Sequence, residues 1–208
     1  MYYLCCAGIG YVFGSISPSY IVGKLKKVDL RTTGTKNLGA SNTFMHFGRF
    51  WGALVMLFDI FKAFAAVKLC QFLFHELAFA GLVAGSTSVL GHNYPFYLKF
   101  KGGKGLASYG GFILGVSPIL FLLLLFCCIA FALIFNYGCA IALSAAVLFP
   151  ILVGIKFGSV FAFLITAVCS VSLFYKHIEN LHRIRAGEET KFRTFIGKYI
   201  LNLTGKRS

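Results

Sequence analysis

Seven apolar runs divide the sequence and constrain its fold more than any other feature. They cover residues 2–23, 50–72, 77–91, 106–117, 118–135, 137–155 and 159–175. A bilayer core about 30 Å thick needs roughly 20 apolar residues per helical crossing, so the chain has room for about six or seven crossings. Only 12% of the residues are charged, which is low for a soluble domain. We therefore predict an all-α integral membrane protein in which residues 1–208 form a single polytopic domain.

The apolar region 106–135 admits two interpretations: one long helix, or two short helices that fold back at Pro118. Proline disfavours the helical conformation in the residue before it, and the basic residues decide between the two. Six of them lie in 24–49, three in 99–104 and eight in 176–207. The positive-inside rule places all three stretches in the cytoplasm, which requires an even number of crossings between the last two. We therefore predict seven transmembrane helices with the N-terminus outside and the C-terminus cytoplasmic.

The N-terminal run, the cysteines and the net charge exclude several classes of protein. Residues 1–23 contain no basic residue and no small-residue cleavage pattern, so we interpret them as a first crossing and not as a removable signal peptide. All seven cysteines lie in or beside apolar runs, where cysteine behaves as a small apolar residue, so we expect neither zinc ligands nor disulfides. The net charge of +14 accompanies no nucleic-acid-binding module. We expect the lipid bilayer as a partner and no nucleic acid.

Three polar stretches, 24–49, 91–105 and 176–208, carry the candidate site and are expected on the cytoplasmic side. The first contains the segment DLRTTGTKNLGASN at 29–42, which is dense in small residues, hydroxyls, amides and cations. Backbone N–H groups in such a segment can turn toward an anion. An ordinary polar loop with turns is the alternative interpretation.

The second stretch contains KGGKG at 101–105, immediately before an apolar run. Two ammonium groups on a glycine-rich backbone, which can approach a ligand closely, favour anion binding. The spacing is not that of a Walker A loop, and no strand precedes it. A basic cluster that only sets membrane orientation would explain the lysines but not the interleaved glycines.

The third stretch and the second apolar run each contain a pair of polar residues at helical spacing. His177 and Asn180 share a helical face by their i, i+3 spacing, although a basic juxtamembrane helix that binds anionic lipid is the alternative. Asp59 and Lys62 lie near the middle of their run, where an isolated charge costs about 2.5–3.5 kcal/mol on insertion scales. We expect these two to pair, either for structure alone or to position the basic loops.

Several motifs together resemble one known family. They are Gly14-Ser15-Ile16, GTKNLGASN at 34–42, Asp59-x-x-Lys62, Gly91-His92-x-x-Pro95 with FKGGKG at 100–105, and Asn180-x-x-Arg183-Ile184-x-x-Gly187-x-Glu189. Over essentially the whole chain they resemble the bacterial acyl-phosphate:glycerol-3-phosphate acyltransferases, the PlsY family. The resemblance implies a seven-helix enzyme of phospholipid biosynthesis in the cell inner membrane with its active site on the cytoplasmic side. It would transfer a fatty acyl group from acyl-phosphate to glycerol 3-phosphate, giving 1-acyl-glycerol 3-phosphate and phosphate.

Carried over residue by residue, the resemblance also implies a set of site residues. Substrate would be bound by Thr35, Lys36, Asn37, Asn42, Lys101, Gly102, Gly103, Ser108 and Glu189, and the catalytic residues would be Lys104, His177 and Asn180. Acyl-phosphate is already activated, so positioning and charge stabilisation suffice, without a cofactor, a metal or a covalent intermediate. No general base is singled out, and a substrate phosphate oxygen can take the proton. An upstream enzyme that forms acyl-phosphate is a possible partner.

Rival functions and one departure from the family pattern also follow from the sequence. The sequence contains no His-x4-Asp pair, which counts against the acyl-CoA-type glycerolipid acyltransferases. A non-catalytic membrane protein that binds or transports phosphorylated lipids or organic phosphates is the alternative function, although we see no inverted repeats typical of transporters. Met45 stands where the family has an arginine, and Lys36 where it has a glycine. We hypothesise that Lys36 supplies the lost charge.

Overall fold

The computed structural model describes residues 1–197, and the predicted third polar stretch extends beyond them at 198–208. The elements are α1 (Tyr2–Ser15), α2 (Pro18–Leu25), α3 (Ala40–Phe47), α4 (Arg49–Leu73), α5 (Ala80–Asn93), the 3₁₀ helix η1 (Phe96–Leu98), α6 (Leu106–Val116), α7 (Pro118–Phe135), α8 (Cys139–Phe157), α9 (Val160–Lys176), α10 (Ile178–Arg185) and α11 (Phe192–Phe195). Within residues 1–197 the only β-type pairing is an isolated bridge between Tyr137 and Lys191. The protein is therefore all-helical over the described part, as predicted.

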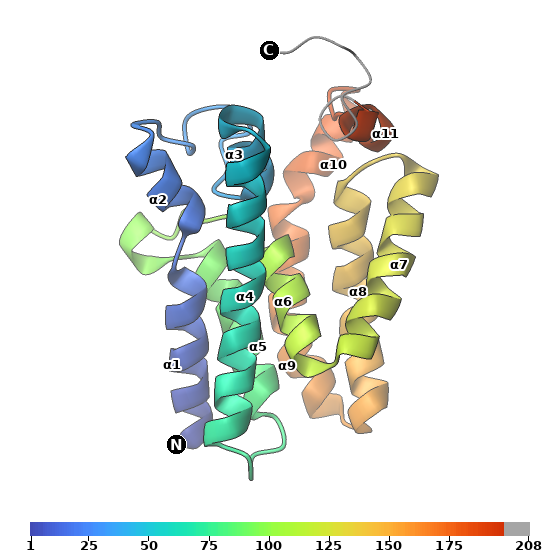
Figure 1. The fold of residues 1–208 in the computed structure, drawn as a ribbon. Helices are drawn as coiled ribbons and strands as arrows, with labels where there is room; N and C mark the ends of the chain where they lie inside the picture. Colours follow the sequence, from blue (N-terminus) through green and yellow to red (C-terminus); the bar gives the residue numbers. More distant parts are fainter. Residues whose placement is uncertain (198–208) are drawn as a thin grey trace.

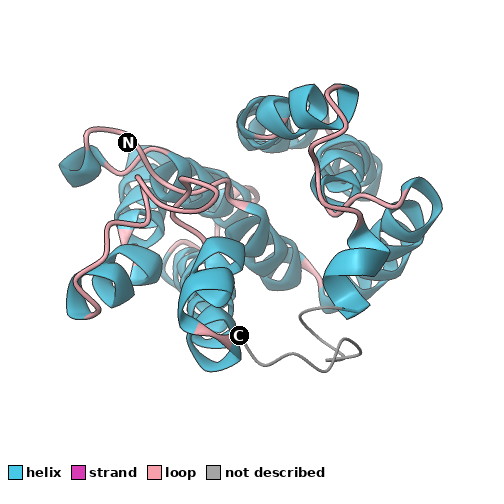
Figure 2. Ribbon diagram, turned by 90° about the horizontal axis from the view of Figure 1, so that it is seen from above, coloured by secondary structure: helices cyan, strands magenta, loops and turns pink. Residues whose placement is uncertain are grey.

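The helices pack in a continuous sequence of neighbours. α1, α4 and α5 contact one another, α6 and α9 join them to the rest, and α7 and α8 pack together at the opposite side (Figure 1). The short helices α3, α10 and α11 lie at one end, and the N-terminus lies at the other (Figure 1). Seen from above, the long helices stand nearly end-on and the connecting loops cross over them (Figure 2). The short helices and loops of the described polar stretches thus lie outside the apolar middle of the bundle.

Four segments of the described chain are long and apolar enough to cross a membrane. They are Tyr2–Leu25, Pro118–Phe135, Cys139–Phe157 and Val160–Arg185. The other three predicted crossings correspond to α4, with 25 residues, α5, with 14, and α6, with 11. The last two are shorter than a full span of about 20 residues. The count of seven crossings and their orientation therefore stay predictions.

Glycines permit close approach between α1 and α5. A Cβ at Gly10 or Gly14 of α1 would overlap the backbone of α5 at Ala84 or Ser88. Small residues at such contacts let backbones approach in lipid, where apolar side chains gain little from leaving the solvent. The resulting α1–α5 contact fixes the height of the α5 C-terminus, from which the second polar stretch begins.

A serine–proline pair separates consecutive helices at two places in the chain. Ser117 is extended between α6 and α7, and its hydroxyl accepts a hydrogen bond from the N–H of Leu120. This confirms the prediction of two helices in 106–135. Ser17 separates α1 from α2 in the same way, its hydroxyl accepting from the N–H of Tyr20. The apolar pattern predicts a single run over 2–23, and the break at Ser17 differs from it.

Candidate active site

The first polar stretch is folded around one amide, the fully buried side chain of Asn42 at the start of α3. Its Nδ2 donates to the carbonyls of Leu30 at 3.0 Å, Thr33 at 3.1 Å and Asn37 at 3.1 Å. Its Oδ1 accepts the backbone N–H of Thr35 at 3.1 Å. The donors and acceptor of this amide are thus engaged within the loop. In this conformation Asn42 shapes the loop that presents Thr35 and Asn37.

The side chains that this loop presents differ in exposure. Thr35 and Asn37 are half-buried, whereas Lys36 is exposed. Lys36 adopts the left-handed conformation, with φ 52°, which glycine adopts more readily than lysine. Met45, on α3, is half-buried. The charge of Lys36 is therefore at the surface of the loop, and its proposed link to the position of Met45 stays a prediction.

The connection between α5 and α6 is held against the first polar stretch at Gly103. The N–H groups of Gly102 and Gly103 donate to the carbonyls of Asn93 at 3.2 Å and His92 at 3.1 Å. A Cβ at Gly103 would overlap both His92 Nε2 and the Leu38 carbonyl. Position 103 therefore requires glycine, because any side chain would separate the two polar stretches.

The N-terminus of α6 lies directly after this connection and offers unpaired backbone donors. Gly105 precedes the helix with φ 88°, a left-handed conformation that suits glycine. The first bond of the helix runs from the N–H of Tyr109 to the Gly105 carbonyl, at 2.8 Å, and the N–H groups before it have no partner within the helix. Such N–H groups attract anions. Ser108 lies among them but is fully buried, and its hydroxyl has no hydrogen-bond partner in the described structure.

A polar network joins the second and third polar stretches. Lys104 Nζ donates to Asn180 Oδ1 at 2.5 Å, and Asn180 Nδ2 donates to Glu189 Oε1 at 2.7 Å. Arg183 Nε donates to the other carboxylate oxygen of Glu189 at 2.7 Å. Asn180 and Arg183 come from α10, Lys104 from the residues before α6, and Glu189 from the segment after α10. The structure thus brings Lys104, Asn180 and Glu189 together, although they are distant in the sequence.

Glu189 belongs to a segment that is tied to the turn between α7 and α8. The Phe192 N–H donates to the Asn136 carbonyl at 2.9 Å, and the Arg193 N–H donates to Asn136 Oδ1 at 3.0 Å. Lys191 donates to the Tyr137 hydroxyl at 2.5 Å. We call residues 188–193 the C-terminal strap. No local pattern in the sequence indicates this contact, which fixes the segment that carries Glu189.

The surroundings of Lys104 favour its neutral form more than water would. Partial burial, and after it the charge of Arg183, lower the pKa of the Lys104 ammonium below its ordinary value, while Glu179 and Glu189 act in the opposite direction. His177 lies nearby at the end of α9 and is buried. Its Nδ1–H donates to the Leu173 carbonyl at 2.8 Å, which leaves Nε2 as an acceptor in the neutral ring.

A buried ionic cluster underlies the α5–α6 connection. Lys62 Nζ lies 2.7 Å from Asp59 Oδ1, 2.6 Å from the Ile16 carbonyl and 3.0 Å from His92 Nδ1. The pairing of Asp59 with Lys62 predicted from the sequence is therefore confirmed. Asp59 Oδ1 also lies 3.3 Å from His92 Nδ1 and has no hydrogen-bond partner within the described residues, so Asp59 is held here by ion pairing. His92 Nε2 faces Gly103, which links this cluster to the α5–α6 connection.

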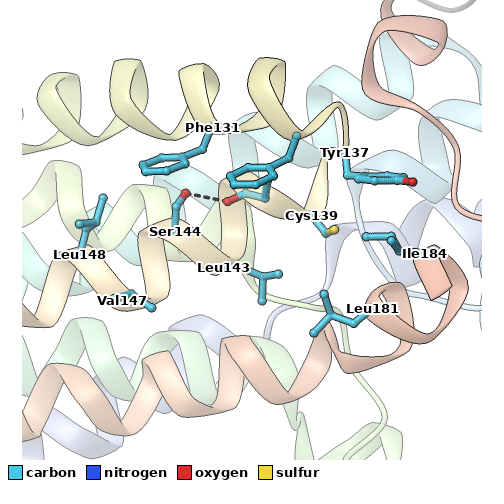
Figure 3. A pocket seen from close by; sticks show the side chains of 11 residues that line it. Phe131, Tyr137, Cys139, Leu143, Ser144, Val147, Leu148, Leu181 and Ile184 are labelled. Atoms are coloured by element: carbon cyan, nitrogen blue, oxygen red, sulfur yellow. Dashed lines mark hydrogen bonds between the residues drawn. The ribbon is translucent and has the colours of Figure 1, made fainter.

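An apolar pocket of about 510 Å³ adjoins the polar network. Phe131 and Phe135 of α7, Leu143 and Leu148 of α8, and Leu181 and Ile184 of α10 are among the residues that line it (Figure 3). Leu181 and Ile184 directly follow Asn180 and Arg183 in sequence. The helix α10 therefore turns polar side chains to the network and apolar ones to the pocket. Sequence reasoning missed these residues because each lies in an apolar run or among charged neighbours, with no local signal of a cavity.

The predicted site residues do not all converge in this structure. Lys101 is exposed and Gly102 is half-buried, whereas Ser108 and Asn42 are buried. The contacts of Lys104, Asn180 and Glu189 give the site its centre, and the first polar stretch reaches it through Leu38 and Gly103. In residues 1–197 no group of three or more His, Cys, Asp or Glu side chains is placed to hold a metal ion.

The fold and this site define an integral membrane protein with a basic polar network beside an apolar pocket. Residues 4–187 match the model of the glycerol-3-phosphate acyltransferase family. The chain belongs to this family, and it is an acyltransferase of phospholipid synthesis.

Individual relatives cover nearly the whole chain. A glycerol-3-phosphate acyltransferase 1 from Oceanobacillus iheyensis is 37% identical over 205 residues, covering 95% of this chain and 99% of the relative. A glycerol-3-phosphate acyltransferase from Coxiella burnetii is 40% identical over 189 residues, covering 89% and 95%. The crystal structure of PlsY, an integral membrane glycerol 3-phosphate acyltransferase, in its glycerol 3-phosphate form superposes with a TM-score of 0.83 at 30% identity, covering 91% of this chain and 95% of PlsY. Its lysophosphatidic acid form gives a TM-score of 0.80 at 29% identity, with coverage of 91% and 94%.

Proposed function

We propose that this protein transfers a fatty acyl group from acyl-phosphate to glycerol 3-phosphate, giving 1-acyl-glycerol 3-phosphate and inorganic phosphate. One observation carries the proposal. Helix α10 presents Asn180 to Lys104 on one side and Leu181 to an apolar pocket of about 510 Å³ on the other. A donor with a phosphate head and an aliphatic tail fits this combination, and the relatives named above carry the name of the glycerol 3-phosphate acceptor.

The phosphate groups would be held by cations and by backbone donors. Lys104, Lys101 and the unpaired N–H groups at the start of α6 suit the phosphate of the acyl donor. The loop around Asn42 would present Thr35, Lys36 and Asn37 to glycerol 3-phosphate, with Gly102 and Gly103 allowing the two substrates to approach each other. The buried Ser108 hydroxyl lies one turn into α6 and would take part only if the helix start opens on binding.

The reaction requires few chemical groups from the protein. The primary hydroxyl of glycerol 3-phosphate attacks the acyl carbonyl, the bond from the carbonyl carbon to the phosphate oxygen breaks, and phosphate leaves. The hydroxyl proton passes to a phosphate oxygen, so no side chain need act as the base, and the protein works through orientation. Lys104, positioned by Asn180 and Glu189, stabilises the charge that develops. His177 Nε2 is an acceptor that can orient the attacking hydroxyl.

The acyl chain of the donor would enter the apolar pocket. Removing the acyl chain from water contributes about 0.8 kcal/mol per methylene group whether the acyl chain enters the bilayer or the pocket. The pocket would therefore mainly position the acyl chain. The pocket opens between α7, α8 and α10. This position would let a lipid product leave sideways into the bilayer while phosphate leaves on the polar side.

The membrane arrangement that goes with this function has seven crossings, the N-terminus outside and the site on the cytoplasmic face of the inner membrane. A cytoplasmic site would receive acyl-phosphate from an upstream enzyme and glycerol 3-phosphate from solution. Single cysteines at positions 35, 104 and 189, in a background without the exposed Cys5 and Cys127, should all resist a membrane-impermeant reagent added to intact cells. Labelling of one of the three from outside would refute this topology.

The decisive test is a defined assay of the purified full-length protein with acyl-phosphate and glycerol 3-phosphate, scored for lysophosphatidate and phosphate in equal amounts. The Asn180→Ala variant should lose this turnover, whereas Glu188→Ala, an exposed neighbour of Glu189, should keep it. Acyl-CoA offered in place of acyl-phosphate should give no product. Binding of both substrates without turnover would instead support a non-catalytic protein.

A further inference from the structure

A second pocket, of about 350 Å³, lies at the C-terminal end of α2. Tyr20, Lys24, Lys27 and Arg31 are among the residues that line it. It shares no lining residue with the apolar pocket and none with the Lys104 network. The proposed acyl transfer does not use this second pocket, so the basic residues that line it require a separate explanation.

The pocket carries positive charge that its own residues do not neutralise. Arg31 forms an ion pair with Asp29, at 2.8 Å. Lys24 and Arg31 both lie over the ring of Tyr20, at 5.4 Å and 5.6 Å from its centroid. In residues 1–197, neither Lys24 nor Lys27 has an acidic side chain within ion-pair distance. Two ammonium groups are therefore available to an anionic ligand at this pocket.

Lys27 occupies a backbone position that a lysine rarely fills. Its φ is 57°, its N–H donates to the Lys24 carbonyl at 3.1 Å, and the next N–H, that of Val28, donates to the Gly23 carbonyl at 2.9 Å. Just after a helix, this left-handed position usually holds glycine or asparagine. Lys27 therefore places a cation at the rim of the pocket in a backbone conformation that lysine rarely adopts.

Neighbouring residues indicate that the pocket lies at the depth of the lipid headgroups. Ile21 and Leu25, one turn apart on α2, are 50% and 69% exposed. Lys26 lies over the ring of Trp51, at 5.1 Å, and tryptophan is enriched at the membrane–water interface. Exposed apolar side chains thus adjoin the two ammonium groups. A free phosphate ion could use only the cations, whereas a phospholipid could use both surfaces.

We infer that Lys24 and Lys27 form a second, non-catalytic site for the phosphate-bearing headgroup of an anionic phospholipid, with an acyl chain of that lipid along Ile21 and Leu25. Basic residues near a membrane surface attract anionic lipid by about 1 kcal/mol each, which corresponds to about a fivefold change in affinity. Occupation of the site would stabilise the end of α2 and the polar loop that follows it.

The test uses the full-length protein in nanodiscs of phosphatidylcholine with increasing amounts of phosphatidylglycerol, and it measures the melting temperature. The parent protein should gain stability as phosphatidylglycerol rises, because a ligand that binds the folded state stabilises it. The Lys27→Gly variant should melt no lower than the parent in pure phosphatidylcholine, because glycine suits the left-handed backbone. The Lys27→Gly variant should nevertheless need about five times as much phosphatidylglycerol as the parent to reach half of its own increase in melting temperature.

A neighbouring lysine serves as the matched control. Lys26→Gln removes the same charge one residue away, at a side chain that does not line the pocket, and should keep the parent's dependence on phosphatidylglycerol. Equal losses for Lys27→Gly and Lys26→Gln would show a general surface effect and overturn the site. Inorganic phosphate that stabilises the parent in pure phosphatidylcholine as strongly as phosphatidylglycerol does would overturn the assignment to a lipid. None of these readouts depends on acyl transfer, so they separate this inference from the proposed function.

Discussion

Lys62 Nζ lies 3.0 Å from His92 Nδ1, and this contact joins the middle of α4 to the end of α5. The same ammonium reaches the Ile16 carbonyl, which the break between α1 and α2 leaves without a helical partner. Because His92 Nε2 in turn faces Gly103, one buried lysine connects three helices to the connection that carries Lys104.

The Lys62→Met variant should be strongly destabilised. It leaves the Asp59 carboxylate buried without its partner, and breaking a buried ion pair in this way costs about 3–5 kcal/mol. Thermal unfolding in detergent should show this loss, and Lys62→Met combined with Asp59→Asn should recover a large part of it. Lys68→Met, at an exposed position of the same helix, should unfold near the parent temperature. A mild effect of Lys62→Met would contradict the assigned cluster.

Lys104→Ala should abolish most activity, whereas Lys99→Ala should change it little. Lys104 donates to Asn180 and is half-buried, but Lys99 is exposed. Loss of a positioned charge-stabilising contact typically lowers kcat by about 100-fold to 1,000-fold. Steady-state rates of the two variants compare the positions directly. Equal, small losses would mean that the basic cluster sets membrane orientation only.

Lys36→Gly tests whether Lys36 replaces the arginine of the family pattern. Glycine accepts the φ of 52° at this position, so the variant removes the charge without straining the loop. If Lys36 binds glycerol 3-phosphate, its apparent affinity should fall sharply, and adding Met45→Arg should restore much of it. A double-mutant cycle should then give a non-additive contribution of about 0.5–3 kcal/mol. An unchanged KM for glycerol 3-phosphate would identify Lys36 as a solvated loop charge.

Activity should decline at alkaline pH as Lys104 loses its proton. Burial and the charge of Arg183 lower its pKa, so this decline should begin at a lower pH than an exposed lysine would give. Arg183→Gln removes the repelling charge and should move the alkaline limb of the kcat profile to higher pH. Arg185→Gln, exposed on the same helix, should leave the limb in place. A shift to lower pH in Arg183→Gln would contradict this electrostatic explanation.

The parts of the fold that local sequence determines were predictable. Proline at 118, with the distribution of basic residues, predicted the division of 106–135 into two helices, and the cost of a lone charge in the membrane predicted the Asp59–Lys62 pair. The break at Ser17 was missed because the apolar run continues past it, although the same serine–proline pair occurs there. α3 was also missed, since its short polar sequence resembles the loop around it.

The candidate site was only partly predictable, because its contacts join distant parts of the chain. The resemblance pointed to Lys104, Asn180 and Glu189, but not to the order in which they bond. The apolar pocket could not be predicted, since Phe131 and Leu148 look like any lipid-facing residues until α10 packs beside them. The C-terminal strap pairs residues more than fifty positions apart, and no sequence period marks such a contact.

The strap also affects when the protein becomes competent during synthesis. The bonds from Phe192 and Arg193 to Asn136 can form only after these two residues have left the ribosome, by which time every long helix of residues 1–197 has been made. A nascent chain that stops before these residues would therefore insert its helices but lack the strap that fixes Glu189 beside Asn180. Acyl transfer is expected to begin only once the strap has been synthesised, so shorter nascent chains in the membrane would have little activity.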